Sequence, residues 1–354
     1  MATDRDRLLA FLRQPQDASK LETYRLLFGT LMVFSTVRFI ASGWVESIYL
    51  EPTYHFTYLG FGWIRPWPRA CMYVHLVVQA AAALCFALRI RPRLSISIFF
   101  VLFTYAELIE KAAYLNHYYF VSLMAFLLIW MPWGQAKRTG SVPRCVYWFL
   151  LAQVAIVYFY AGAAKLGADW LFEGQPLHLW LQAYQELPLV GRLAGSRQVA
   201  IAMSWAGALF DLTIWAWLLW KRSRPFAVAA GIFFHVFVWV LFPIGVFSWV
   251  MIANMTLFFE PDWRRRLLEK LGLGNRTAPY EQANDDATAR PTYVRWLLWF
   301  GAAWLVVQLA LPLRHWAYPG DVNWSEQGFR FAWRVMLIDK VGSVEYRVSA
   351  NELD

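Results

Sequence analysis

The sequence predicts an all-α polytopic membrane protein with about nine transmembrane helices and a short extramembrane C-terminal tail that contains β-structure. Of the 354 residues, 59% are hydrophobic and 16% are charged, whereas about a quarter of the residues in soluble domains are charged. Several apolar runs approach the roughly 20 residues that a helix needs to cross a bilayer. Backbone groups in the bilayer core must bond within their own segment, so each run is predicted to be helical.

The nine candidate spans are apolar runs separated by charged or turn-forming segments. We predict them at 24–41, 71–88, 94–110, 115–131, 145–163, 199–220, 226–243, 245–259 and 294–312. The seventh and eighth runs are separated only by "FPIG", whose proline and glycine end helices.

The distribution of basic residues predicts a cytoplasmic N-terminus. With that orientation the inside segments carry 19 Lys and Arg and the outside loops carry 6, as the positive-inside rule requires. Nine spans then place the C-terminus outside the cytoplasm. We therefore expect a transmembrane domain over 1–312, with a cytoplasmic linker at 260–293, and the start of an extracytoplasmic tail domain at 313–354. The alternating stretch "VEYRVSA" in this tail predicts a strand.

The net charge of +9 does not indicate a nucleic-acid partner, because membrane proteins concentrate Lys and Arg in their cytoplasmic loops. No zinc-finger spacing is present, and the six histidines are never paired at i, i+3 or i+4, so no metal site is predicted. The three cysteines lie in or beside apolar runs and are expected to be small buried hydrophobes.

The stretch "AGAAKLGADW" places Lys165 directly after a long uncharged run. One interpretation is an interfacial anchor whose amine reaches the membrane surface, with Asp169 and Trp170 as ordinary boundary residues. The other is a functional amine, because a lysine sheltered among apolar residues can be neutral near physiological pH and act as a base. The residues alone leave both interpretations open.

Three further polar groups lie at or within the predicted spans. His117 follows Asn116 at the outer start of the fourth span, on the membrane face where Lys165 ends the fifth span. His235 lies mid-span, either in a structural hydrogen bond between helices or beside a cofactor. Asp211 also lies within a span and needs a partner, so an ion pair or a helix-to-helix hydrogen bond is expected.

Four segments of the chain carry a resemblance to a known family. They are "LNHYYFVSLMAF", "IVYFYAGAAKLGADWLFEG", "FFHVFVWVLFPIGVFSWVMIANMTLFFEPDW" and "NWSEQGFRFAWRVML". Together they resemble vitamin K-dependent gamma-glutamyl carboxylases and their bacterial relatives, which share the horizontally transferred transmembrane (HTTM) domain. The resemblance runs in order from about Tyr24 to Arg347.

The resemblance implies an enzyme of the carbon–carbon lyase class that uses a reduced naphthoquinone, dioxygen and carbon dioxide. A lysine deprotonates the quinol, oxygen-driven epoxidation generates a strong base, and that base removes a proton from the γ-carbon of a glutamate. The resulting carbanion adds carbon dioxide. The implied partners are the lipid bilayer, the quinone and a glutamate-containing peptide or protein.

The resemblance also implies roles for particular residues. Lys165, followed by Leu166, matches the family's catalytic base, and His117 matches its active-site histidine. Further positions are implied to bind the quinone or the substrate, and they are Asn116, Asp169, Trp170, His235, Trp333 and Met336.

Two other functions remain open from the sequence. One is a quinol epoxidase or oxidase that carboxylates nothing, and the other is a quinone- or lipid-binding membrane module without catalysis. Incorporation of carbon dioxide into peptide separates the carboxylase from the epoxidase, and formation of quinone epoxide separates both enzymes from the binding module.

Overall fold

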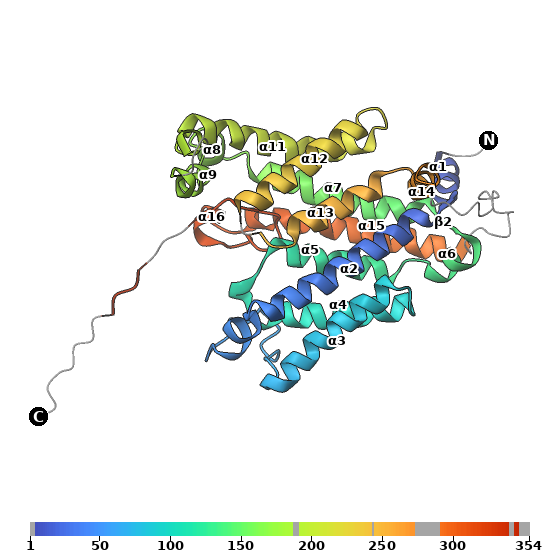
Figure 1. The fold of residues 1–354 in the computed structure, drawn as a ribbon, viewed down its shortest axis with the longest axis horizontal. Coiled ribbons are helices and arrows are strands. Elements are labelled where there is room, and N and C mark those ends of the chain that lie inside the picture. The colour runs from blue at the N-terminus through green and yellow to red at the C-terminus, as the bar shows by residue number, and fades with distance from the viewer. Residues whose placement is uncertain (1–3, 187–190, 243, 273–290, 340–342, 347–354) are drawn as a thin grey trace, which may run out of the picture.

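The computed structural model describes residues 4–186, 191–242, 244–272, 291–339 and 343–346. Long helices run side by side in one bundle (Figure 1). The helices are α1 (Asp4–Arg13), α2 (Ser19–Ala41), α3 (Arg69–Ala87), α4 (Pro92–Ile109), α5 (Asn116–Ile129), α6 (Trp133–Thr139), α7 (Arg144–Ala164), α8 (Ala168–Leu171), α9 (Leu177–Leu181), α10 (Gly191–Ala194), α11 (Arg197–Leu219), α12 (Arg224–Leu241), α13 (Phe247–Met255), α14 (Trp263–Lys270), α15 (Pro291–Ala310) and α16 (Val322–Ser325). Short 3₁₀ turns cover Lys111–Ala113, Gln182–Tyr184, Thr256–Phe258 and Leu311–Ala317, and a π-helical turn covers Glu46–Leu50.

Within the described part of the chain, seven helices are long and apolar enough to cross a membrane. They are α2, α3, α4, α7, α11, α12 and the helix formed by α15 with the 3₁₀ turn that follows it. The protein is therefore a multi-pass membrane protein, as its composition predicts.

The expected count of nine spans is not confirmed. The helices α5 and α6 pass the length and hydropathy test only as a pair, and they are bent by 58° at the break between them. The run expected at 245–259 is a shorter apolar helix over Phe247–Phe258. The described helices thus give seven spans, or up to eight if the bent pair counts as one.

The helix α7 forms the centre of the bundle. Its sequence is apolar on every face, which is typical of a helix surrounded by other helices. It has the largest buried share among the seven spans, 67% of its most apolar stretch. It packs most extensively against α11, and it also contacts α15 and α5, while α2, α3, α4 and α5 pack in sequence on the other side. Side chains of α7 therefore contact α11 and α15 as well as α5, the last helix of the group α2–α5.

The two ends of the bundle carry different elements. The helices α1, α6 and α14 gather at one end, and α8, α9 and α16 gather at the other (Figure 1). The strands β1 (Pro15–Asp17) and β2 (Ser141–Pro143) pair antiparallel at the first end, with Gln16 opposite Val142.

The tail differs from expectation. Its described part contains the short helix α16 and a series of turns, and residues 344–346, the start of the expected strand, form no strand. The rest of that strand, 347–350, lies outside the described residues, as does the polar middle of the linker at 273–290. The linker begins with the helix α14, whose sequence "WRRRLLEK" is strongly basic.

Candidate functional site

A cavity of about 770 Å³ lies between α5, α7, α11, α12 and α13 and beside the tail segment 329–338. This volume falls within the roughly 300–1,000 Å³ that is typical of small-molecule sites. Most of the wall is apolar, and phenylalanines of α11, α12 and α13 contribute much of it. Besides three tyrosines, the ionisable and amide side chains in the wall are Arg38, Asn116, His117, Lys165, Asp211, His235 and Arg334.

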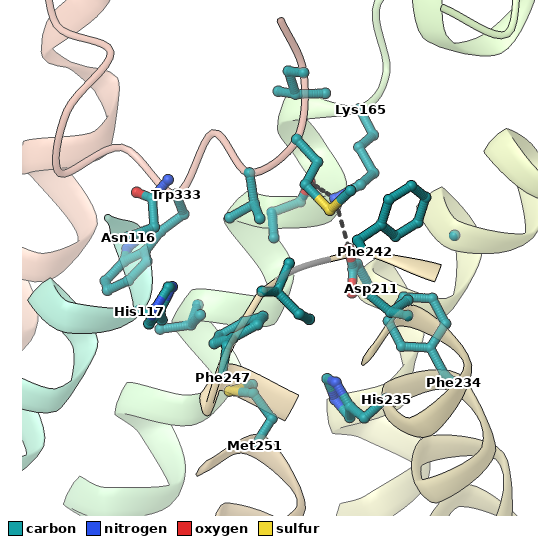
Figure 2. Close-up of a pocket in the computed structure, with 18 of the residues that line it drawn as sticks. Asn116, His117, Lys165, Asp211, Phe234, His235, Phe242, Phe247, Met251 and Trp333 are labelled. Atoms are coloured by element: carbon teal, nitrogen blue, oxygen red, sulfur yellow. Dashed lines mark hydrogen bonds and ion pairs between the residues drawn. The ribbon is translucent and has the colours of Figure 1, made fainter. Parts of the chain in front are cut away.

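Lys165 and Asp211 form a buried ion pair in this wall (Figure 2). The Nζ atom of Lys165 lies 2.8 Å from Oδ2 of Asp211 and donates a second hydrogen bond to the carbonyl of Ala161 at 3.2 Å. Lys165 is 7% exposed and Asp211 is 6% exposed, and the Trp170 ring lies 5.5 Å from the ammonium. The ion pair expected of Asp211 is thus confirmed, and the interpretation of Lys165 as an anchor that reaches the membrane surface is wrong.

A close approach of α7 and α11 brings this pair together. Lys165 directly follows the last residue of α7, and Asp211 lies in the middle of α11. At Gly162, one turn before Lys165, a Cβ atom would lie 2.6 Å from the backbone nitrogen of Leu212. Glycine at this position therefore allows the two backbones to approach closely enough for the ion pair.

His117 and Asn116 lie on the other side of the cavity from Asp211 and His235 (Figure 2). The His117 ring packs against Phe247, with ring centroids 5.5 Å apart. Among the described residues, no group donates or accepts a hydrogen bond at the His117 ring nitrogens. His117 and Lys165 therefore line one cavity, as their shared membrane face predicts, but they are not bonded to each other.

His235 lines the cavity and also makes a bond between helices. It is 2% exposed, and its Nε2 atom lies 2.8 Å from the hydroxyl of Tyr158 on α7. The rings of Phe234 and Phe247 contact it edge-on. The hydrogen bond between helices is thus confirmed, and the same histidine faces the cavity, while a cofactor beside it stays a prediction.

The tail segment 329–338 forms one wall of the cavity and supplies Trp333 and Met336 to it. Phe331, Trp333 and Met336 all have positive φ angles, of 62°, 58° and 56°. Residues other than glycine keep this conformation only where the surroundings impose it. Trp333 is 1% exposed and stacks on Tyr119, with ring centroids 5.0 Å apart.

Hydrogen bonds tie this segment to α5. The side-chain amide of Asn116 donates to the Arg334 carbonyl at 2.9 Å, and its oxygen accepts from the Tyr114 hydroxyl at 3.0 Å. The Arg334 guanidinium contacts Oδ1 of Asn323 and Nε2 of His315, both at 3.2 Å. Burial lowers the pKa of Arg334, although the charge of Asp321 acts in the opposite direction. Asn116 therefore holds the tail wall in place.

Asp169 is the one expected site residue that the structure does not bring into the cavity wall. Its side chain is exposed, whereas its neighbour Trp170 is buried and donates from Nε1 to the carbonyl of Ser204 at 2.8 Å. The short helix α8 turns the two side chains apart. The carboxylate that pairs with Lys165 is Asp211, 46 positions away along the chain.

Sequence reasoning did not identify Arg38, Tyr114, Tyr118, Tyr158 and Arg334 as groups of this wall, and two of them illustrate why. Tyr158 is one, and no signal in an aromatic-rich run distinguishes it from its neighbours. Arg38 is the other, and it carried a signal, because a charged residue inside an apolar span marks a functional position by default. Among the described residues, no group of three or more His, Cys, Asp or Glu could hold a metal ion.

Comparison with known families gives two matches. The HTTM domain matches residues 13–263, and the lumenal domain of vitamin K-dependent gamma-carboxylase matches residues 293–354. No solved structure matches the chain. The first match alone covers well over half of the sequence, and the two matches occur in the order in which the bundle and the tail follow each other. The chain therefore belongs to the family of vitamin K-dependent gamma-carboxylases and their relatives with an HTTM domain, as the four segments predict.

Proposed function

We propose that this protein is a gamma-carboxylase that couples the oxidation of a reduced naphthoquinone to the carboxylation of glutamate side chains. The observation that carries the proposal is the buried Lys165–Asp211 pair in the wall of an apolar cavity of about 770 Å³. An amine that is held by a carboxylate and shielded from water can exchange protons with a bound ligand. The family matches support carboxylase-like chemistry of this kind.

The cavity suits a flat lipophilic quinol. Phenylalanines of α12 extend from its wall to the outer surface of the bundle, where Phe233 is 71% exposed and Phe237 is 38% exposed. A ligand dissolved in the bilayer can therefore enter from the side. The buried Nε1 of Trp333 has no hydrogen-bond partner among the described residues, which leaves a donor in the wall for a ligand oxygen.

When bound, a reduced naphthoquinone would supply the reducing equivalents that dioxygen consumes, and its oxidation would generate the strong base. The lysine of the resting ion pair must first release a proton to solvent, and the neutral amine at Nζ then accepts the proton of the ligand hydroxyl. Asp211 compensates the ammonium charge that results, so this proton transfer creates no unpaired buried charge on the protein. The Trp170 ring lies over the ammonium and favours its charged form through a cation–π contact.

His117 and the tail segment form the side of the cavity that we assign to the glutamate. The His117 ring nitrogens are free of protein partners in the described structure, so they are available to a substrate carboxyl group or a ligand oxygen. Trp333 and Met336 lie next to this position in the tail wall. We place the N-terminus in the cytoplasm and the tail outside it, so that the peptide reaches the cavity from the extracytoplasmic side while the quinol comes from the lipid.

Purified protein in detergent tests the proposal. It is given a reduced naphthoquinone, dioxygen, a glutamate peptide and labelled bicarbonate as the source of carbon dioxide, and both quinone epoxide and labelled peptide are measured. We expect both products from the wild type and neither from Lys165→Ala. The matched control is Lys137→Ala, which removes an exposed lysine outside the cavity wall and should leave both products unchanged.

The two products separate the competing functions. Epoxide without labelled peptide would establish a quinol epoxidase, and the proposed carboxylation would be wrong. If the wild type binds quinol but forms no epoxide, the chain is a quinone-binding module, and the whole catalytic proposal fails.

A further inference from the structure

The charges in the cavity wall do not balance. Three cationic side chains line it, Arg38, Lys165 and Arg334, and Asp211 is the one carboxylate among the described lining residues. Asp211 is engaged by Lys165 at 2.8 Å. Two positive charges are therefore left without a carboxylate in the wall, and a mostly apolar cavity strengthens their attraction for an anion.

Arg38 is the less constrained of these two cations. Arg334 already contacts Asn323 and His315, and its backbone carbonyl is held by Asn116. Arg38 lies in the last turn of α2, and its guanidinium packs over the Trp44 ring, 4.6 Å from the ring centroid. Its buried Nε atom has no hydrogen-bond partner among the described residues. A guanidinium supplies five donors in a planar fork, so most of this capacity remains free for a ligand.

The turn between α12 and α13 holds the Arg38 guanidinium in place. Gly245 in this turn has a φ angle of 61°, and a Cβ atom built there would lie 2.5 Å from Nη2 of Arg38. The arginine is thus held between a tryptophan ring and a glycine backbone. This packing fixes the direction in which the planar guanidinium points, but it provides no hydrogen-bond acceptor for the N–H groups.

Arg38 is close to the side of the cavity that we assign to the substrate. Arg38 and His117 both line the cavity, and the turn that holds Arg38 leads into Phe247, which packs on the His117 ring. Arg38 and His117 come from α2 and α5, whereas Lys165 and Asp211 come from α7 and α11. The wall therefore has an uncompensated cation near His117 and a neutralised ion pair between α7 and α11.

We propose that Arg38 binds the γ-carboxylate of the glutamate substrate through a bidentate pair of hydrogen bonds. The inference rests on the proposed function and names the group that recognises its substrate. Removing a γ-proton breaks a carbon–hydrogen bond and moves its electron pair toward the carboxylate oxygens, while the proton goes to the base supplied by quinol oxidation. The carbanion then forms a carbon–carbon bond with carbon dioxide. A fixed cation at the carboxylate stabilises the charge that develops there.

Peptide binding to the purified protein tests this assignment independently of turnover. Two short peptides that differ only by glutamine in place of glutamate are titrated into the wild type, Arg38→Gln and Arg38→Lys by calorimetry. We expect the wild type to prefer the glutamate peptide by about 10- to 100-fold, as a charge-assisted pair provides, and Arg38→Gln to lose that preference. Arg222→Gln, which removes an exposed arginine outside the cavity wall, should keep it.

Two results overturn the assignment: a wild type that binds both peptides equally, or an Arg38→Gln variant that keeps the wild-type preference. If Arg38→Gln does not fold, Arg38→Lys is used instead. Lysine cannot form the bidentate pair, so the preference for the glutamate peptide over the glutamine peptide must fall several-fold. Epoxide formation is measured in the same preparations. If the proposed function is wrong, the wild type forms no epoxide. If only the assignment of Arg38 is wrong, the wild type still forms epoxide, but replacing Arg38 does not change the preference for the glutamate peptide.

Discussion

Replacing Asp211 by asparagine tests the most unusual electrostatic feature of the bundle. The substitution keeps the size of the side chain but removes its charge, so the ammonium of Lys165 stays buried without a counter-ion. Both residues are less than 10% exposed, so the ammonium has little contact with water to replace the lost carboxylate. We therefore expect Asp211→Asn to destabilise the fold strongly.

The expected magnitude follows from the geometry. At the observed 2.8 Å separation, an effective dielectric constant of about 20 gives an attraction of about 6 kcal/mol between the two charges. Desolvation offsets part of this attraction, and breaking buried ion pairs typically costs about 3–5 kcal/mol. We therefore expect the free energy of unfolding to fall by about 3–5 kcal/mol in Asp211→Asn. The double variant with Lys165→Met should recover about 2 kcal/mol or more, because it removes the uncompensated charge.

Equilibrium unfolding in mixed micelles with increasing sodium dodecyl sulfate, followed by tryptophan fluorescence, measures these differences. Asp169→Asn is the matched control, because it removes an exposed carboxylate four residues after Lys165 and should change stability by less than about 0.5 kcal/mol. The reasoning is refuted if Asp211→Asn unfolds within about 1 kcal/mol of the wild type, since breaking a buried pair costs more than that. It is equally refuted if the double variant is less stable than Asp211→Asn.

Gly162→Ala should force α7 and α11 apart and lower the free energy of unfolding by about 1–3 kcal/mol in the same assay. The control is Gly134→Ala, where a Cβ meets nothing within 4 Å, and it should not lower the free energy of unfolding. Equal stability of the two variants would contradict the close approach of the helices. At Glu260, burial alone would raise the pKa, but hydrogen bonds from Arg224 and Lys221 outweigh burial and hold the pKa below its usual value of 4.5. A carboxylate with a lowered pKa stabilises the fold above its unfolded pKa and loses this effect as pH falls through the folded pKa. Wild type should therefore be more stable than Glu260→Gln at neutral pH, and the difference should shrink as pH falls below 4.5; a difference that is independent of pH would exclude this role.

The sequence predicted the membrane class and the positions of most helices because apolar runs and helix length follow from one physical requirement, the satisfaction of backbone groups in lipid. It did not predict which apolar runs form helices long enough to span the membrane. The run at 245–259 is as apolar as the others, but the turn before it leaves a helix of only Phe247–Phe258. The residues at which a helix begins and ends within an apolar run depend on packing, and hydropathy alone does not show them.

The residues of the cavity were harder to predict than the helices. The sequence indicated that Asp211 needs a partner but did not name Lys165 as that partner, because the packing of α7 on α11 decides which carboxylate meets the amine. Resemblance to the family indicated Trp333 and His235, and both line the cavity. Arg38 carried a signal as a charge inside an apolar span, but only the packing of the helices shows that it faces this cavity.

The hydrogen bond from Asn116 to the Arg334 carbonyl joins the tail to α5 and therefore to the helix bundle. The tail is a wall of the cavity, so a ligand that prefers one position of Trp333 also prefers one position of the tail. Thermodynamic linkage makes this preference reciprocal. If a peptide binds the tail and a lipophilic ligand fills the cavity, any change that one makes in the affinity of the other is returned by the same factor, without direct contact between them.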